Sequence, residues 1–253
     1  MTNFNNCFFS ALILLLLTTI QNISASPLWQ SNNVYLLHGT GFEVDSNEQT
    51  TLTLEHTSKW SIGDLFFFTD LTKYRGSEQG DGVYAEFSPR ISIGKLSSTH
   101  FDFGPVKDLL ITSTVEFGKG DIETFLIGPA FDLNLSGFDY FSLNIYRRFT
   151  KNDRDGETIQ ITPVWGMSHN LGGANLIFEG FIDWNVNSDG NYHSNLHFNP
   201  RLKYDLHKLL NVKSGSAMFG IEYSYWKNKY GIKSSSQFDT NQSAISLLLN
   251  YKF

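Results

Sequence analysis

Charged side chains recur at every second position in several short segments of this chain. Glu86 and Arg90 alternate with apolar residues between positions 83 and 93, and Arg201 and Lys203 do so between positions 195 and 205. Successive side chains of a β-strand point to opposite faces, so this spacing gathers the charges on one wet face. Such a face can line a water-filled path, and its acids and bases can also pair with one another across that path.

The histidines do not have the spacing that catalysis or metal binding would need. They stand at positions 38, 56, 100, 169, 193, 197 and 207, on different predicted strands and turns. His193 and His197 are four apart, but His197 falls on a predicted strand, so the two do not share a helical face. Leu171-Gly172-Gly173 is typical of a turn and not of a phosphate-binding loop. We expect no catalytic residue, no metal and no cofactor, and a barrel enzyme is the least favoured alternative.

The elements that position the charged side chains are predicted to be strands. Short segments with period-two alternation are separated by clusters of Gly, Asn, Asp and Ser, and no long run has helical spacing. Their even number predicts an all-β chain that folds as a 12-stranded antiparallel up-and-down transmembrane β-barrel. The predicted strands are 33–39, 50–60, 64–70, 83–93, 108–117, 122–133, 140–150, 157–166, 175–185, 195–205, 217–227 and 243–253.

The last ten residues show the alternation most clearly. One register is wholly apolar, and the other contains Ser246, Asn250 and Lys252. An edge strand of a soluble sheet usually carries charges that discourage pairing, so this segment favours a lipid-facing strand. A soluble sandwich also alternates, with its apolar face buried between two sheets, and it is the alternative fold. The apolar register is Ile245, Leu247, Leu249, Tyr251 and Phe253.

Two further features concern the strands and their ends. Pro89 and Pro200 lie in the middle of predicted strands and cannot donate a ladder hydrogen bond, so we expect bulges there. Aromatic residues gather near the predicted strand ends, where Tyr and Trp suit the membrane–water boundary. The aromatic residues expected in this girdle are Trp60, Phe101, Phe103, Trp165, Trp184, Trp226, Tyr230 and Tyr251.

Residues 1–25 differ from the rest of the chain. The apolar run Leu12–Leu17 is too short to cross a bilayer as a helix, and Ile23-Ser24-Ala25 offers a small-residue cleavage site. This pattern predicts a secretory signal peptide, followed by a barrel of residues 26–253. No Lys or Arg precedes the run, so an uncleaved anchor is the alternative. The single Cys, at position 7, lies in this segment, and the mature chain is expected to have no disulfide.

Composition bears on partners and on the membrane. The formal net charge of -6 argues against nucleic acid as a partner, because binding its phosphates needs a basic patch. The mean hydropathy of -0.21 resembles that of soluble proteins. This average is compatible with a transmembrane barrel, because apolar and polar residues alternate in its strands and their hydropathies offset each other in the mean.

The segment Glu86-Phe87-Ser88-Pro89-Arg90-Ile91-Ser92-Ile93, with Lys95-Leu96 and Phe103-Gly104-Pro105 after it, resembles the nucleoside-specific channel (Tsx) and OmpK-type outer-membrane protein family. Trp29-Gln30-Ser31, Gly180-Phe181-Ile182-Asp183-Trp184 and Tyr251-Lys252-Phe253 support the resemblance. It covers nearly all of residues 29–253. The resemblance implies a multi-pass barrel of the bacterial outer membrane through which nucleosides and deoxynucleosides pass passively. Some relatives are known chiefly as phage receptors, so a receptor or adhesion barrel with a largely plugged lumen is the alternative.

The resemblance also implies what the lumen must recognise. A nucleoside is a flat, uncharged base on a polar sugar, which calls for aromatic faces and hydrogen-bonding side chains. Phe181 stands out as an aromatic residue between two acids on the wet register. Pairing across the lumen is the alternative role of the charged residues. The candidates for substrate binding are Glu55, Tyr84, Glu86, Arg90, Tyr146, Arg148, Glu179, Phe181, Asp183, Arg201 and Lys203.

The expected partners follow from the same interpretation. Nucleosides, and ions along the same path, are the permeating solutes, and outer-membrane lipid surrounds the barrel. The C-terminal strand, which ends in Tyr251 and Phe253, is expected to engage the barrel-assembly machinery.

Overall fold

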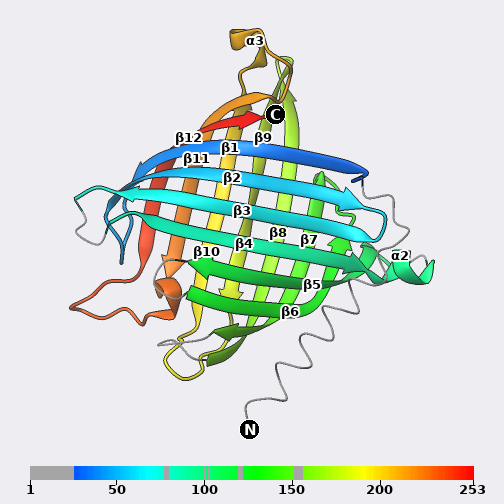
Figure 1. The fold of residues 1–253 in the computed structure, drawn as a ribbon. Helices are drawn as coiled ribbons and strands as arrows, with labels where there is room; N and C mark the ends of the chain where they lie inside the picture. The colour runs from blue at the N-terminus through cyan, green and yellow to red at the C-terminus, as the bar shows by residue number, and fades with distance from the viewer. Residues whose placement is uncertain (1–25, 77–79, 100, 102, 119–121, 151–155) are drawn as a thin grey trace.

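Twelve strands pair in chain order into a closed ring (Figure 1). The computed structural model describes residues 26–76, 80–99, 101, 103–118, 122–150 and 156–253. The predicted all-β barrel and its twelve strands are confirmed, with ends that differ by a few residues. The strands are β1 (Trp29–Thr40), β2 (Glu48–Trp60), β3 (Gly63–Tyr74), β4 (Gly82–Ser92), β5 (Val106–Gly118), β6 (Ile122–Leu133), β7 (Tyr140–Thr150), β8 (Gly156–Leu171), β9 (Ala174–Asn185), β10 (Asn195–Asp205), β11 (Ala217–Lys227) and β12 (Gln242–Lys252).

The ring closes through antiparallel pairing of β1 with β12. Val34 lies opposite Tyr251, and Leu36 lies opposite Leu249. Because the side-chain period of a strand is two, this register sets the apolar residues of both strands on the same outer face. On the inner face Leu37 lies opposite Leu248, and both are buried.

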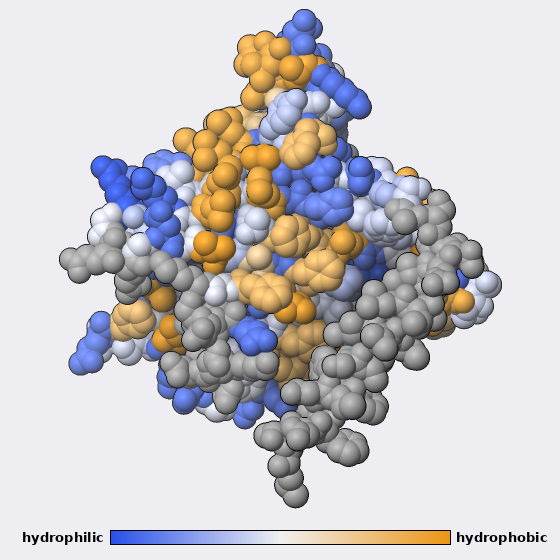
Figure 2. Space-filling view, in the orientation of Figure 1, coloured by the Kyte–Doolittle hydropathy of each residue, from blue (hydrophilic) through white to orange (hydrophobic). Residues whose placement is uncertain are grey.

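The outer face is apolar and exposed, as a lipid-facing wall must be. Along β12 the outward side chains Ile245, Leu247, Leu249 and Tyr251 are each more than half exposed. Figure 2 shows hydrophobic side chains, in orange, gathered over the wall of the barrel. The sheet closes on itself, so the alternative of a two-sheet sandwich is wrong.

The bulges expected at Pro89 and Pro200 are absent from the described strands. The β4–β5 pairing is interrupted after Phe87 and resumes at Arg90 in the same register, and the pairing of β10 with β11 passes Pro200 in the same way. A proline lacks a backbone N–H, which would point to only one of the two neighbouring strands. The sheet therefore loses a single inter-strand hydrogen bond, and no extra residue is inserted as in a bulge. A register shift is recorded instead within Val106–Asp108 of β5.

The two ends of the barrel differ in their connections. The start of β1, the end of β12 and the β2–β3, β4–β5, β6–β7, β8–β9 and β10–β11 connections share one end, here called the turn end. The other connections form the loop end. The two long turn-end connections contain the short helices α2 (Ile93–Ser97) and α3 (His207–Leu210), and the β11–β12 loop contains the 3-10 turn η2 (Lys229–Gly231).

None of the helices in the described ranges is long and apolar enough to cross a bilayer. The predicted signal peptide, residues 1–25, lies outside the described residues.

Candidate functional site

All eleven candidate side chains lie on the inward register of their strands. Contacts between distant strands establish the direction, because Arg201 of β10 reaches Glu55 of β2 past β11, β12 and β1. The Tyr146 hydroxyl lies 3.0 Å from Thr112 Oγ1 on a nearby inward position. Direct contact of these residues with a solute stays a prediction. The eleven candidates on the inward register are Glu55, Tyr84, Glu86, Arg90, Tyr146, Arg148, Glu179, Phe181, Asp183, Arg201 and Lys203.

Arg201 of β10 contacts side chains of β11, β1 and β2 on one side of the lumen. Its Nε lies 2.6 Å from Glu222 Oε2, its Nη1 lies 3.6 Å from Glu55 Oε2, and its guanidinium carbon is 4.8 Å from the centre of the Tyr35 ring. Glu55 also accepts hydrogen bonds from Tyr35 Oη at 3.3 Å and from Asn33 Nδ2 at 3.1 Å. Every charge in this group has an opposite charge or a donor beside it, which offsets the cost of withdrawing it from water.

Lys203 continues the same group toward β9. Its Nζ lies 2.6 Å from Glu179 Oε1 and 5.4 Å from the centre of the Tyr35 ring. The Tyr35 side chain is fully buried beneath these two cations and is a fixed part of the wall.

Arg90 forms a second ion-pair group near the turn end. It makes two bonds to the Asp64 carboxylate, at 2.7 and 2.8 Å, and a third to Asp132 Oδ1 at 2.9 Å. Ser142 Oγ donates to the same Asp132 oxygen at 2.7 Å. The paired bonds hold the planar guanidinium in one orientation and join strands β3, β4, β6 and β7.

Arg148 forms a third group nearer the loop end. Two bonds of 2.5 and 2.7 Å link it to the Glu116 carboxylate, and a third of 3.2 Å reaches Gln160 Oε1. Its guanidinium carbon lies 5.4 Å from the centre of the Tyr192 ring, which belongs to the β9–β10 loop. Arg148 therefore connects the wall of the lumen to a loop at the mouth.

Glu86 and Asp183 are held by neutral donors. Glu86 accepts a hydrogen bond of 2.7 Å from Tyr84 Oη. Asp183 Oδ1 accepts bonds from Gln160 Nε2 at 2.9 Å and from Thr162 Oγ1 at 2.6 Å. A carboxylate has more acceptor sites than these bonds use, so both groups can also accept from the hydroxyls of a solute.

Four aromatic rings follow one another along the inner wall, and we call them the aromatic row. Phe181 meets His197 edge to face, with ring centres 5.1 Å apart. His197 stacks on Trp226 with centres 4.0 Å apart and planes within 11°. Trp226 meets Tyr230 edge to face at 5.6 Å. The row thus runs from β9 across β10 and β11 to the β11–β12 loop.

The expected position of two aromatic residues in the girdle was wrong. Trp226 belongs to the aromatic row inside the barrel, and Tyr230 continues that row from the β11–β12 loop at its mouth. Trp226 shares the inward register of Glu222, whose carboxylate meets Arg201 in the lumen. Position near a strand end does not distinguish the two faces of the strand, whereas the register does. Trp184 and Tyr251 do lie exposed on the outer face.

A second set of rings lies on the opposite wall. Phe66 and Phe68 of β3 have centres 5.8 Å apart, and Phe68 lies 5.8 Å from Tyr84 of β4. Strands β3 and β9 are six places apart in the ring of twelve, so these rings and the aromatic row line opposite sides of the lumen.

Sequence reasoning missed four of these inward rings: Phe66, Phe68, His197 and Trp226. His197 falls on the predicted polar register of segment 195–205 but was not named as a candidate for substrate binding. The register could also have identified Trp226, because it lies two positions beyond the polar inward residue Ser224. Leu65-Phe66-Phe67-Phe68 is apolar on both faces, so alternation alone could not orient it.

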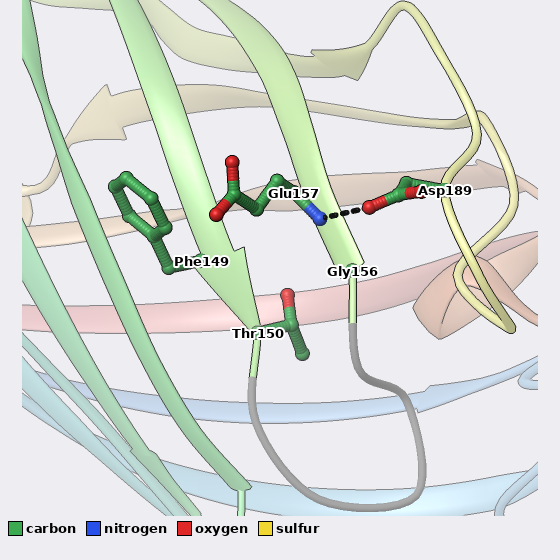
Figure 3. Close-up of a pocket in the computed structure, with 5 residues that line it drawn as sticks. All are labelled: Phe149, Thr150, Gly156, Glu157 and Asp189. Carbon is green, nitrogen blue, oxygen red and sulfur yellow. Dashed lines mark hydrogen bonds between the residues drawn. The ribbon is translucent and has the colours of Figure 1, made fainter. Parts of the chain in front are cut away.

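A pocket of about 320 Å³ lies at the loop end of β7 and β8 (Figure 3). Phe149 and Thr150 at the end of β7, Gly156 and Glu157 at the start of β8, and Asp189 of the β9–β10 loop line it. The Glu157 backbone N–H donates to Asp189 Oδ2 at 2.8 Å. The pocket holds none of the candidate residues, so we assign it no role.

The lumen as a whole offers three kinds of contact. Aromatic faces on opposite walls can stack on a flat ring, carboxylates and amides can bond to hydroxyl groups, and ion pairs hold the wall in one shape. These are binding and positioning functions, which suit the passage of a polar aromatic solute.

The chain is similar in sequence to known outer-membrane proteins. The outer-membrane protein OmpK of Vibrio parahaemolyticus is 25% identical over 223 residues, which cover 84% of this chain and 82% of OmpK. The nucleoside-specific channel-forming protein Tsx of Salmonella typhimurium is 25% identical over 230 residues, covering 79% and 74%. The solved KdgM porin aligns over 87% of this chain and 99% of its own, at 10% identity and a TM-score of 0.48. The family model described as nucleoside-specific channel-forming protein, Tsx, matches residues 27–253, and the chain is therefore an outer-membrane barrel of that family.

Proposed function

We propose that this chain is a passive outer-membrane channel selective for nucleosides and deoxynucleosides. The observation that carries the proposal is the aromatic row inside the lumen, faced by Phe66, Phe68 and Tyr84 on the opposite wall. Family membership supports the same solute class. Base–aromatic stacking is worth roughly 1–3 kcal/mol per base and tolerates every base, so a row of rings favours nucleosides as a group.

The sugar needs different contacts from the base. Asp183 and Glu86 have acceptor sites for ribose hydroxyls, and Asn199 on β10 lies on the inward register opposite Phe181. Several weak sites in series suit transport better than one strong site, because a solute must leave each site as readily as it enters. In this mechanism Arg90, Arg148, Arg201 and Lys203 keep the wall rigid through their ion pairs, and their neighbours contact the solute.

Electrical recording in a planar bilayer tests the proposal. The purified protein should conduct ions, and adenosine or thymidine should reduce that current in a saturable manner because a stacked base obstructs the path. A sugar without a base, such as ribose, should reduce it far less. Conduction that ignores both nucleosides would contradict selectivity. A barrel that does not conduct would favour the alternative of a receptor with a plugged lumen.

The two chain termini have proposed roles in reaching the membrane. We propose that residues 1–25 are a cleaved signal peptide and that the barrel-assembly machinery recognises the C-terminal strand. Tyr251 and Phe253 support the second role, since these residues are 54% and 71% exposed at the end of the lipid-facing wall.

The termini can be tested separately. N-terminal sequencing of the mature protein should begin at Ser26. Deleting Phe253 should reduce the amount of heat-modifiable barrel in the outer membrane, whereas Lys252→Ala should not. Equal assembly of the Phe253 deletion would contradict the C-terminal role.

A further inference from the structure

Lys229 of the β11–β12 loop has an almost fully buried side chain at the loop end of the barrel. Its amine donates to three oxygens: the backbone carbonyl of Glu43 at 2.8 Å, Asp45 Oδ2 at 3.1 Å and Gln242 Oε1 at 2.8 Å. Burial lowers the pKa of this amine below its ordinary value, and the charge of Asp45 opposes that shift. Two loops and the start of β12 therefore converge on one ammonium group.

The backbone around this amine is held in unusual conformations. Asn228, Tyr230 and Gly231 have φ values of 51°, 59° and 71°, and Val44 in the facing loop has a φ of 73°. Left-handed conformations are unfavourable for residues with a side chain, and most of all for a β-branched one, so surrounding contacts must maintain them. The strain in both loops lies next to the Lys229 amine.

A third loop completes the arrangement. The Gly231 carbonyl accepts a hydrogen bond of 2.9 Å from the backbone N–H of His193, and Asn228 Nδ2 donates to the Ser194 carbonyl at 2.9 Å. A Cβ on Gly231 would lie 2.7 Å from the Tyr192 ring, so only glycine fits there. The β11–β12 loop is thus fixed against the loops on both of its sides.

The residue that this arrangement fixes is Tyr230. Its hydroxyl donates to Asp45 Oδ2 at 2.9 Å, the same oxygen that Lys229 contacts. Its half-buried ring meets Trp226 at 5.6 Å and is the member of the aromatic row that stands in a loop at the mouth.

We propose that Lys229 and Asp45 are positioning residues that hold Tyr230 as the first aromatic contact for a nucleoside entering from the loop end. Lys229 draws the Asp45 carboxylate under the loop, Asp45 fixes the tyrosine hydroxyl, and the ring then continues the row that begins inside the lumen. Selectivity thus begins at the mouth. The inference rests on the proposed nucleoside channel and adds a role for loop residues that do not contact the solute.

The test measures nucleoside entry from each side separately. Single barrels of known orientation in a planar bilayer receive adenosine on the loop-end side or the turn-end side, and current fluctuations give the association rate. Lys229→Met and Asp45→Asn should each lower the loop-end rate about fivefold or more, because a loosened ring loses most of one stacking contact. The turn-end rate should stay within about twofold of the unaltered channel, because entry there does not pass Tyr230.

Further variants separate positioning from a general structural role. Tyr230→Leu should lower the loop-end rate as much as Lys229→Met, and combining the two should add nothing, since both act through one ring. Lys229→Arg, which keeps a donor for Asp45, should restore most of the rate. Lys233→Met is the matched control, because Lys233 is an exposed lysine in the same loop, and it should change nothing.

Three other results would each contradict a specific claim. If Lys229→Met leaves the loop-end rate unchanged while Tyr230→Leu lowers it, positioning by Lys229 is wrong. If a variant lowers the rates from both sides equally, its effect is on the barrel as a whole and the inference fails. If the unaltered channel conducts without any response to adenosine, the proposed function itself fails, and the inference falls with it.

Discussion

Adjacent arginines show how much the register of a strand decides for a single residue. Arg148 points inward and is 10% exposed in a pair with Glu116, whereas Arg147 points outward and is 63% exposed in a pair with Glu157. Both side chains form an ion pair, yet only the inward one is withdrawn from water. The two residues therefore form a natural comparison of a buried and an exposed ion pair on one strand.

Arg148→Met should destabilise the barrel by about 3 kcal/mol, because the buried Glu116 carboxylate loses its partner. Arg147→Met, one position away, should cost less than about 1 kcal/mol, because solvent screens the exposed pair. Urea unfolding of the two variants in lipid vesicles measures the difference. Equal effects would mean that water reaches the Arg148 pair as freely as the outer one.

Trp226→Leu should weaken nucleoside block of the channel by about 1–3 kcal/mol, because it removes one of the two middle rings of the aromatic row. Phe181→Ala at the inner end of the row should act in the same direction. Tyr225→Leu is the control, since Tyr225 directly precedes Trp226 in β11 and its own side chain points to the outer face. Titration of adenosine against single-channel current gives the blocking constants, and identical constants for Trp226→Leu and Tyr225→Leu would remove the row from the binding path.

At the scale of the element, each strand faces two solvents. The outward register of β12 meets lipid, so a charge in its middle should be costly and a charge near its end should not. Leu247→Arg should destabilise the barrel by about 2–4 kcal/mol, whereas Ser243→Arg near the loop end should cost about 0–1 kcal/mol. Folding yield and stability toward urea in vesicles measure the effect of each variant. Similar losses of stability for the two variants would mean that the bilayer covers a different part of the strand.

Alternation made most of the strands predictable from sequence. Segments such as 195–205 and 243–253 separate apolar from polar positions so cleanly that their inward residues could be named in advance. The positions of Phe66 and Phe68 could not be predicted, because both faces of that segment are apolar. The partners of the inward charges could not be predicted either, since Arg201 meets Glu55 only after the ring has closed.

Predictions made from a residue's sequence neighbours were wrong where the closed sheet or the register of a strand determined the structure. Pro89 was expected to force a bulge, but the neighbouring ladders keep their register around the missing donor. Trp226 was expected at the lipid boundary because it is close to a strand end, but its register turns it inward. Tyr230 was expected there too, and its place in the row depends on the buried Lys229 contact with a loop far away in sequence.

The lumen of the barrel carries more acid than base. Among the described strands, its four buried or half-buried cations are Arg90, Arg148, Arg201 and Lys203. The buried or half-buried carboxylates on the same register are Glu55, Asp64, Asp70, Glu86, Asp108, Glu116, Asp132, Glu179, Asp183, Asp205 and Glu222.

This imbalance predicts a preference for cations among small ions, because a low-dielectric wall concentrates the field of its charges in the path. The reversal potential across a gradient of potassium chloride measures the preference. Glu86→Gln together with Asp183→Asn should reduce the preference, while Glu157→Gln on the outer face should leave it unchanged. A reversal potential of the opposite sign would show that the paired cations dominate the path.

A ring-shaped sheet with aromatic walls inside should pass nucleosides in preference to other polar solutes. Flux into vesicles that contain the purified barrel measures this directly, with labelled adenosine compared against an uncharged sugar of similar mass. Adenosine should enter much faster than the sugar, its rate should saturate, and Trp226→Leu should reduce the difference. Entry of adenosine and the sugar at the same unsaturable rate would contradict this preference.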